Sequence, residues 1–206
     1  MSNDIEQIRD KIIEQSLFDA QIDGWSWALI QKAAQDCGYS DDMPSSVFPD
    51  GLDDTLNHFA DWADRKMMKR LEDIDPEDLR VRDRVKVAVL KRYGVLEPHK
   101  EAVRYALAHW TVPGRQIRAG KILWRTSDKI LTWGGDTSTD YNHYTKRGLL
   151  SSVIASTTLV WLNDQGFNEQ SGSTDGLSST HRFLDARIEN VLSIGKNLGK
   201  FKSFVS

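Results

Sequence analysis

Cysteine is almost absent from this chain, whose 206 residues include only Cys37. An internal disulfide is therefore excluded, and the composition fits a reducing compartment. Cys37 lies at the end of an apolar helical pattern, which favours a packed structural side chain over a reactive one.

Long apolar runs are also missing. The longest such stretch, residues 149–162, is interrupted by five Ser and Thr residues and is shorter than the roughly 20 residues that a spanning helix needs. We therefore expect any membrane contact to be peripheral. The N-terminal residues lack the basic and apolar regions of a signal peptide. Two locations fit: the cytoplasmic side of a bacterial inner membrane, or the mitochondrial matrix after removal of a leader.

Catalytic motifs are a third absence. The sequence has no Glu-x-x-His pair, no His-Glu-x-x-His, no glycine-rich phosphate loop and no Gly-x-Ser-x-Gly elbow. None of the five histidines stands four residues from another histidine, as a helical metal site requires. We therefore predict a protein that is not an enzyme and that has neither a metal site nor a cofactor.

What the sequence does contain is helical periodicity along nearly its whole length. Apolar residues recur at intervals of three and four, most clearly from Leu52 to Leu71, and no segment alternates as a strand would. The prediction is an all-α fold of about nine to ten helices. The expected helices are 4–21, 25–37, a short one within 40–50, 52–71, 76–93, one after Pro98, 117–133, 141–163, and 180–204 with Thr180 as its cap.

Three short helices followed by a long one resemble the head of a TetR-type repressor over about residues 5–65. That resemblance implies a helix-turn-helix-like head, residues 1–65, on a helical ligand-binding bundle, residues 66–206. In such heads the third helix enters the major groove of DNA.

Basic residues are missing from the segment that would contact DNA. Residues 39–64 contain no Lys or Arg but seven aspartates, and phosphate neutralisation supplies most non-specific DNA affinity. We therefore predict that this head does not bind nucleic acid. A basic cluster within residues 80–92 is interpreted as a solvated face whose charges pair with acids at Asp73, Asp75, Glu77 and Asp83.

The most concentrated polar chemistry lies in residues 134–147. A Gly-Gly turn is followed by Asp, Thr and Ser residues that favour a helix start, and then by two aromatic residues, a histidine and two bases. No nucleophile and base stand at a catalytic spacing here. The segment is therefore better interpreted as a recognition surface than as an active site.

Residues 124–164 carry a resemblance to a known family. Trp124, Asp128, the Gly-Asp-Thr-Ser-Thr-Asp segment 135–140 and the Tyr-Thr-Lys-Arg segment 144–147 are similar to the coenzyme Q (ubiquinone) biosynthesis accessory family, the ninth component of that pathway by its usual name. Phe183 to Ile188 match more weakly. The resemblance implies a TetR-like dimer without DNA binding, which binds isoprenoid lipid and assists the di-iron hydroxylase of demethoxyubiquinone.

The resemblance also implies a docking surface for that hydroxylase. It carries over onto Asp128, Asp140 and Tyr144, whereas His143 departs from the Trp that relatives often have. The complete candidate docking surface comprises Asp128, Asp136, Asp140, His143, Tyr144, Lys146 and Arg147.

A polyprenyl or phospholipid tail that leaves a bilayer needs a buried apolar site in the protein. Burial in such a site keeps the tail out of water, which is worth about 25 cal/mol per Å² of apolar surface. Long apolar helices can supply such a site. The candidate lining residues are Leu107, Trp110, Leu123, Ile130, Leu150, Val153, Ile154 and Leu159.

The last helix pattern combines apolar residues at intervals of three and four with lysines and no acid after Glu189. Such a helix is typical of attachment to an anionic membrane surface, and equally of docking on its own bundle or on a dimer partner. The candidate membrane-binding residues are Val191, Ile194, Lys196, Leu198, Lys200, Phe201 and Lys202.

The leading hypothesis is thus a lipid-binding accessory protein that presents a polyprenylated quinone precursor to a hydroxylase. The alternative is a TetR-like regulator that senses a hydrophobic ligand.

Overall fold

A computed structural model describes residues 2–139, 141–169 and 178–202, with side chains described for 4–139, 141–169 and 178–193. Every regular element in these residues is helical, which confirms the all-α prediction. The α-helices are α1 (Ser2–Ile22), α2 (Trp27–Asp36), α3 (Met43–Val47), α4 (Leu52–Leu71), α5 (Val81–Leu96), α6 (Lys100–Trp110), α7 (Gln116–Trp133), α8 (Tyr141–Asn163) and α9 (Ser179–Lys202). Two 3-10 helices, η1 (Pro76–Asp78) and η2 (Glu97–His99), precede α5 and α6.

The chain forms two compact units. Unit 1 comprises Met1–Met67 with Val95–Ile122, and unit 2 comprises Met68–Gly94 with Leu123–Ser206. These units are defined by packing and are discontinuous in sequence, because residues 95–122 pack with the N-terminal helices. The predicted division into a head and a lipid-binding bundle at residue 65 is a functional one and stays a prediction.

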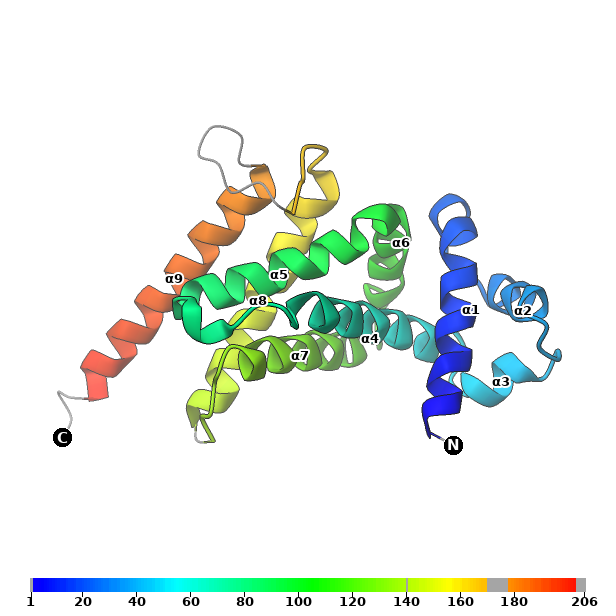
Figure 1. Ribbon diagram of the computed structural model, residues 1–206, viewed down its shortest axis with the longest axis horizontal. Helices are drawn as coiled ribbons and strands as arrows, with labels where there is room; N and C mark the ends of the chain where they lie inside the picture. The colour runs from blue at the N-terminus through cyan, green and yellow to red at the C-terminus, as the bar shows by residue number, and fades with distance from the viewer. Residues whose placement is uncertain (1, 140, 170–177, 203–206) are drawn as a thin grey trace. The chain divides into compact units, whose positions relative to one another are not determined.

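Unit 1 is built around α1, which packs against α2 and α6 (Figure 1). The Ser26 hydroxyl accepts a hydrogen bond from the Leu29 amide and caps α2, and Gly38 ends that helix with φ of +80°, as the left-handed C-terminal signal predicts. Ile12 and Phe48 lie in the core between α1, α2 and α3.

Several acidic side chains of unit 1 are paired with basic residues or buried. Asp53 accepts from His109 at 2.6 Å, Arg118 donates to Asp50 at 2.7 Å, and Asp64 is buried. The short helix α3 carries no base.

Unit 2 has an aromatic core. The Tyr93 ring of α5 stacks on Trp161 of α8 with centroids 5.0 Å apart, and Phe167 meets both rings edge-on. The Tyr93 hydroxyl donates to the Ile154 carbonyl or to Thr158, each at 3.1 Å, so its polar atom is satisfied inside the core. Helix α8 also packs against α9 (Figure 1).

The basic cluster on α5 is used for packing within unit 2. Lys86 binds Asp185 at 2.8 Å and Arg82 lies 3.4 Å from Glu189, both on α9. Arg82 also pairs with the predicted Asp83. The predicted partners were therefore mostly wrong, because the acids nearest in sequence are not the acids that α9 brings to this face.

None of the described helices combines the length and the apolar content that crossing a membrane requires.

Candidate functional site

The site lies in unit 2, where α7 ends and α8 begins. The amides of Gly135 and Asp136 donate to carbonyls of the last turn of α7, at Thr132 and Leu131, and Gly135 adopts φ of +84°. This is the glycine-dependent helix end that the Gly-Gly pair predicts. The chain thereby turns back along α7 and brings residues 136–139 close to the helix that they have just left.

Arg84 of α5 fastens this turn from outside. Its guanidinium donates to the Gly134 carbonyl at 2.8 Å and to the Leu79 carbonyl at 2.9 Å. A side chain added at Gly135 would stand 3.1 Å from the same guanidinium. Arg84 lies within residues 80–92, for which the sequence predicts a solvated face, so that prediction is wrong for this side chain. No local pattern could have revealed its role, because the two carbonyls that it binds are 55 residues apart.

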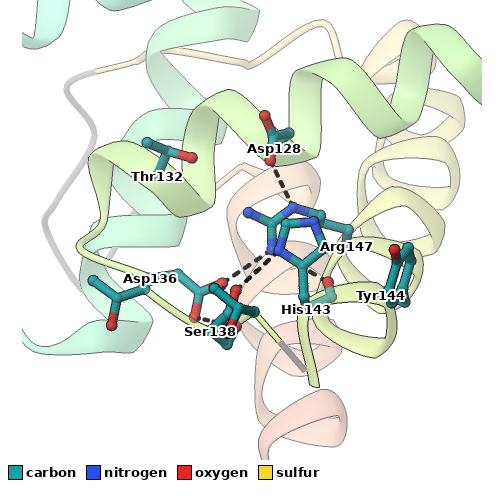
Figure 2. Close-up of a pocket in the computed structure, with 9 residues that line it drawn as sticks. Asp128, Thr132, Asp136, Ser138, His143, Tyr144 and Arg147 are labelled. Atoms are coloured by element: carbon teal, nitrogen blue, oxygen red, sulfur yellow. Dashed lines mark hydrogen bonds and ion pairs between the residues drawn. The ribbon is translucent and has the colours of Figure 1, made fainter. Parts of the chain in front are cut away.

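Arg147 is the centre of the site and is only 3% exposed. Its Nε donates to Asp128 of α7 at 2.6 Å, and one terminal nitrogen donates to Asp136 at 3.0 Å and to the His143 carbonyl at 3.2 Å. Figure 2 shows the guanidinium between Asp128 on one side and Asp136 and Ser138 on the other. Arg147 therefore ties α7, the turn and α8 together.

Asp136 is saturated with donors. Besides Arg147, it accepts from Lys146 at 2.5 Å and from the Ser138 hydroxyl at 2.8 Å. Burial by itself would raise the pKa of Asp136, but the hydrogen bonds from Lys146, Ser138 and Arg147 outweigh it and hold the pKa at about 2. We call Asp128, Asp136, Ser138, Lys146 and Arg147 the Arg147 network.

An aromatic surface covers the side of this network. Tyr144, 64% exposed, lies 6.0 Å from the Trp124 ring and 5.2 Å from the His143 ring, between centroids. The His143 Nδ1 lies 3.0 Å from the Ser138 carbonyl, which can only accept, so this nitrogen carries a proton. We call Trp124, His143 and Tyr144 the aromatic surface.

An open depression of about 440 Å³ lies between the network and the aromatic surface. Nine residues line it: Asp128, Thr132, Asp136, Thr137, Ser138, Thr139, His143, Tyr144 and Arg147. The structure therefore brings together most of the predicted docking residues. Asp140 lies outside the described residues.

The predicted docking residues nevertheless separate into two kinds. The Asp128 carboxylate and the rings of His143 and Tyr144 are reachable from solvent, and so is the Lys146 side chain, which pairs with Asp136. The side chains of Asp136 and Arg147 are buried and saturated, so they shape the surface without presenting charge to a partner. The sequence predicts all seven on one surface, because spacing alone does not reveal which charges are covered.

The predicted lipid-lining residues fall into both units. Ile130, Leu150, Val153 and Ile154 are buried in unit 2, with Leu123 half-buried, whereas Trp110 is buried and Leu107 half-buried in unit 1. Leu159 is 60% exposed, so its side chain does not face the interior of unit 2. It occupies the outer face of α8, where the apolar run continues past the buried stripe.

The predicted membrane helix is only partly described. The backbone of α9 is helical to Lys202, but apart from the half-buried Val191 the side chains of the predicted residues, from Ile194 onward, lie outside the described ones.

A second polar cluster lies at the start of α9. The helix begins at Ser179, so the predicted cap, Thr180, was wrong. Thr180 instead donates through its amide and its hydroxyl to Asp164, at 2.8 and 2.7 Å. Burial raises the pKa of Asp164, and hydrogen bonds from Thr180, Ser178 and Ser179 outweigh it and hold the pKa at about 2.

The similarity to a known protein family lies in the part of the chain that contains this site. The COQ9 family model matches residues 117–195, which include the Arg147 network and the aromatic surface. Residues 117–195 are therefore similar to the COQ9 family. The resemblance that the residues of 124–164 predicted is thereby confirmed.

The similarity to individual COQ9 proteins extends beyond these residues. The mitochondrial ubiquinone biosynthesis protein COQ9 of Homo sapiens is 27% identical over 96% of this chain, and that of Rattus norvegicus is 28% identical over 96%. A probable mitochondrial coq9 protein of Dictyostelium discoideum is 25% identical over 90%. The chain spans about 60–63% of the length of these relatives.

The fold also has a solved counterpart. The crystal structure of a TetR transcriptional regulator from Nitrosomonas europaea superposes with a TM-score of 0.68, at 18% sequence identity, over 90% of this chain and 98% of the regulator. The TetR-like fold predicted from the order of the helices is therefore confirmed. At this identity the similarity concerns the fold alone.

Proposed function

We propose that this chain is a non-catalytic accessory protein of ubiquinone biosynthesis, which binds a polyprenylated quinone precursor and presents it to the di-iron hydroxylase of demethoxyubiquinone. The observation that carries the proposal is the coincidence of the COQ9-like residues, 117–195, with the depression between α7 and α8. The names of the matched relatives supply the pathway.

The hydroxylase docks on the aromatic surface and on Asp128. Tyr144 offers a large exposed ring whose neighbours, Trp124 and His143, hold it in place, and such rigid aromatic anchors dominate binding energy in protein interfaces. Asp128 has its second carboxylate oxygen available beside them, since only Oδ1 accepts from Arg147. The Arg147 network beneath holds both in a fixed relation, which lowers the entropy lost on docking.

The lipid tail lies among the buried apolar residues of unit 2, Ile130, Leu150, Val153 and Ile154. These side chains come from α7 and α8, the same helices that carry the docking surface. Lipid and hydroxylase would therefore be held by one pair of helices, which suits the transfer of a ligand from one protein to the other.

The protein acts as a homodimer at the membrane surface, to which the basic amphipathic end of α9 attaches. Its location is the cytoplasmic face of a bacterial inner membrane or the mitochondrial matrix, and the relatives with mitochondrial names favour the second.

Docking is tested by replacing Tyr144 with Ala. Association with purified hydroxylase, measured by biolayer interferometry, is expected to weaken about tenfold or more, as loss of an aromatic anchor does. Tyr141→Ala is the matched control, because Tyr141 is 75% exposed on the same helix but outside the aromatic surface. Equal weakening by both variants, or by neither, would remove the aromatic surface from the docking site.

Lipid binding is tested by native mass spectrometry of the purified full chain. An isoprenoid quinone or phospholipid is expected to accompany the folded protein. A preparation that carries no lipid, and takes none up from vesicles, would leave the carrier proposal without a ligand.

The shared fold makes a TetR-like regulator the second candidate. The acidic residues and the base-free α3 in unit 1 argue against it, since a duplex would be repelled. Electrophoretic mobility of random duplex DNA at low salt distinguishes the two functions. Tight, salt-sensitive binding would favour the regulator over the lipid carrier.

A further inference from the structure

His181 is a buried histidine that the docking site does not use. It lies in the first turn of α9 in unit 2, it is 1% exposed, and its ring stacks on Phe167 with centroids 5.7 Å apart. Its Nδ1 lies 2.8 Å from the Ser178 hydroxyl. Its Nε2 is buried and has no hydrogen-bond partner among the described residues.

The direction of these hydrogen bonds follows from Asp164. This carboxylate stays ionised at neutral pH, because its pKa is held at about 2, and it can therefore only accept. Ser178 hydrogen-bonds to Asp164 as well as to His181, and its hydroxyl has a single proton. Ser178 therefore donates to Asp164 and accepts from His181.

The tautomer of His181 is fixed as a consequence. Its Nδ1 carries the proton that Ser178 accepts, and its Nε2 presents a lone pair. Burial lowers the pKa of His181 from its ordinary value, and the charge of Lys86 acts in the same direction, so the ring is neutral near pH 7. A buried, neutral Nε2 is an acceptor that lacks a donor, and such groups are uncommon in folded proteins.

The neighbours of the His181 ring include aromatic and apolar side chains. Phe167 meets the Tyr93 and Trp161 rings edge-on, and Leu184, one turn further along α9, is completely buried. On the neighbouring α8, the buried Thr157 hydroxyl also has no hydrogen-bond partner among the described residues. An unpaired acceptor beside apolar side chains can determine the orientation of a bound ring.

We infer that His181 Nε2 accepts a hydrogen bond from a hydroxyl of the bound ring, so that unit 2 favours a hydroquinone over the corresponding quinone. A hydroquinone presents O–H donors, whereas a quinone presents only carbonyl acceptors, which an unprotonated nitrogen cannot bind. The inference rests on the proposed function, because it assumes a quinone-type ligand. What it adds is the redox form of the ligand that the protein binds more tightly.

The experiment compares 2-decyl-1,4-benzohydroquinone with 2-decyl-1,4-benzoquinone under anaerobic conditions, by titration calorimetry on the full chain. The wild type is expected to bind the hydroquinone about fivefold to tenfold more tightly, which is the effect of one additional neutral hydrogen bond. His181→Phe keeps the stacked ring and removes both nitrogens, so it should bind the two forms equally. Thermal unfolding of the variant checks that it folds.

Two further variants sharpen the test. Ser178→Ala removes the acceptor that fixes the tautomer, so Nε2 can carry the proton and the preference should shrink or reverse towards the quinone. Tyr141→Ala lies outside this cluster, with its ring 75% exposed, and should keep the wild-type preference.

The outcomes separate the inference from the proposed function. Equal affinity of the wild type for the two forms, or a preference that survives in His181→Phe, overturns the inference and leaves lipid binding intact. If neither form binds, the carrier proposal fails, and the inference with it. A bound water is the other possible donor. If the ¹⁵N resonance of His181 Nε2 does not change when hydroquinone is added, water is the donor and the inference is wrong.

Discussion

The two polar clusters of unit 2 differ in how completely their hydrogen bonds are made. In the Arg147 network, the buried carboxylate of Asp136 receives three donors and the guanidinium binds both neighbouring acids. In the cluster of Asp164, Ser178, Thr180 and His181, which we call the Asp164 cluster, the carboxylate is equally saturated, but the chain of hydrogen bonds ends at a nitrogen without a donor. A closed network fixes shape, whereas an open one leaves an atom for a ligand.

The comparison predicts that breaking the closed network costs the most stability. Arg147→Met should lower the free energy of unfolding by about 3–5 kcal/mol, because it leaves the buried Asp136 without one of its cationic partners. Urea denaturation measures the loss. Lys146→Met is the control, since the half-exposed Lys146 binds the same carboxylate and should cost less than about 1 kcal/mol. Similar losses in the two variants would mean that burial of Arg147 contributes little.

The carboxylates of the two clusters, Asp136 and Asp164, are predicted to affect the pH dependence of stability in the same way. The folded-state pKa of Asp136 and of Asp164, about 2, lies below the ordinary value of 3.8. Each therefore contributes stability that is present above the unfolded pKa and is lost as pH falls from about 5 towards 2, by roughly 2 kcal/mol per carboxylate.

Denaturation at a series of pH values, with Asp136→Asn and Asp164→Asn, tests this prediction. Each variant should lack its own part of the acid-dependent loss, and the double variant should lack both. A variant with the full wild-type pH dependence would show that its carboxylate is not held by the donors that surround it.

Arg84→Gln tests how the turn beside the closed network is held. It should lower stability by about 1–2 kcal/mol, because two carbonyls, those of Leu79 and Gly134, lose a charged donor. Arg82→Gln on the same helix removes only exposed contacts and should stay within about 0.5 kcal/mol of wild type. Equal costs would mean that Arg84 belongs to a solvated face and does not hold the turn.

The smallest change in stability is expected for His181, whose Nε2 has no hydrogen-bond partner among the described residues. His181→Phe should lower the free energy of unfolding by about 1 kcal/mol, because only the hydrogen bond from Nδ1 to Ser178 is lost and Nε2 makes none. His58→Phe provides the contrast, since the buried His58 Nε2 binds Asp10 at 2.7 Å and its removal should cost about 1–2 kcal/mol. A larger loss at His181 than at His58 would mean that the Asp164 cluster is closed in solution.

Much of the fold could be predicted from local sequence. The α4 and α8 ranges, 52–71 and 141–163, agree with prediction to the residue, because apolar spacing and helix-end residues act within one or two turns. The glycine-ended helices before Gly38 and Gly135 follow from backbone geometry that few other residues adopt. The start of α5 was less accurate, because Pro76 begins a 3-10 turn rather than the helix itself.

The sequence predicted where the candidate site lies, but not which of its residues are exposed. Crowded polar residues and the family resemblance both pointed to 134–147, and the depression lies there. Which of those residues are covered depends on what α7 and the turn place opposite each one. Tyr144 and Arg147 stand three residues apart on α8, yet the first is exposed and the second is buried.

The sequence by itself determined the helices, their order and the stretch that carries the COQ9 signature, because these depend on neighbours within a few residues. Only the tertiary structure decided which charges are paired, as when Lys86 of α5 meets Asp185 of α9 across 99 residues. It also decided that Asp164 orients His181 through Ser178. Hydrogen bonds and desolvation act over a few ångströms, so their partners are set by packing and not by distance along the chain.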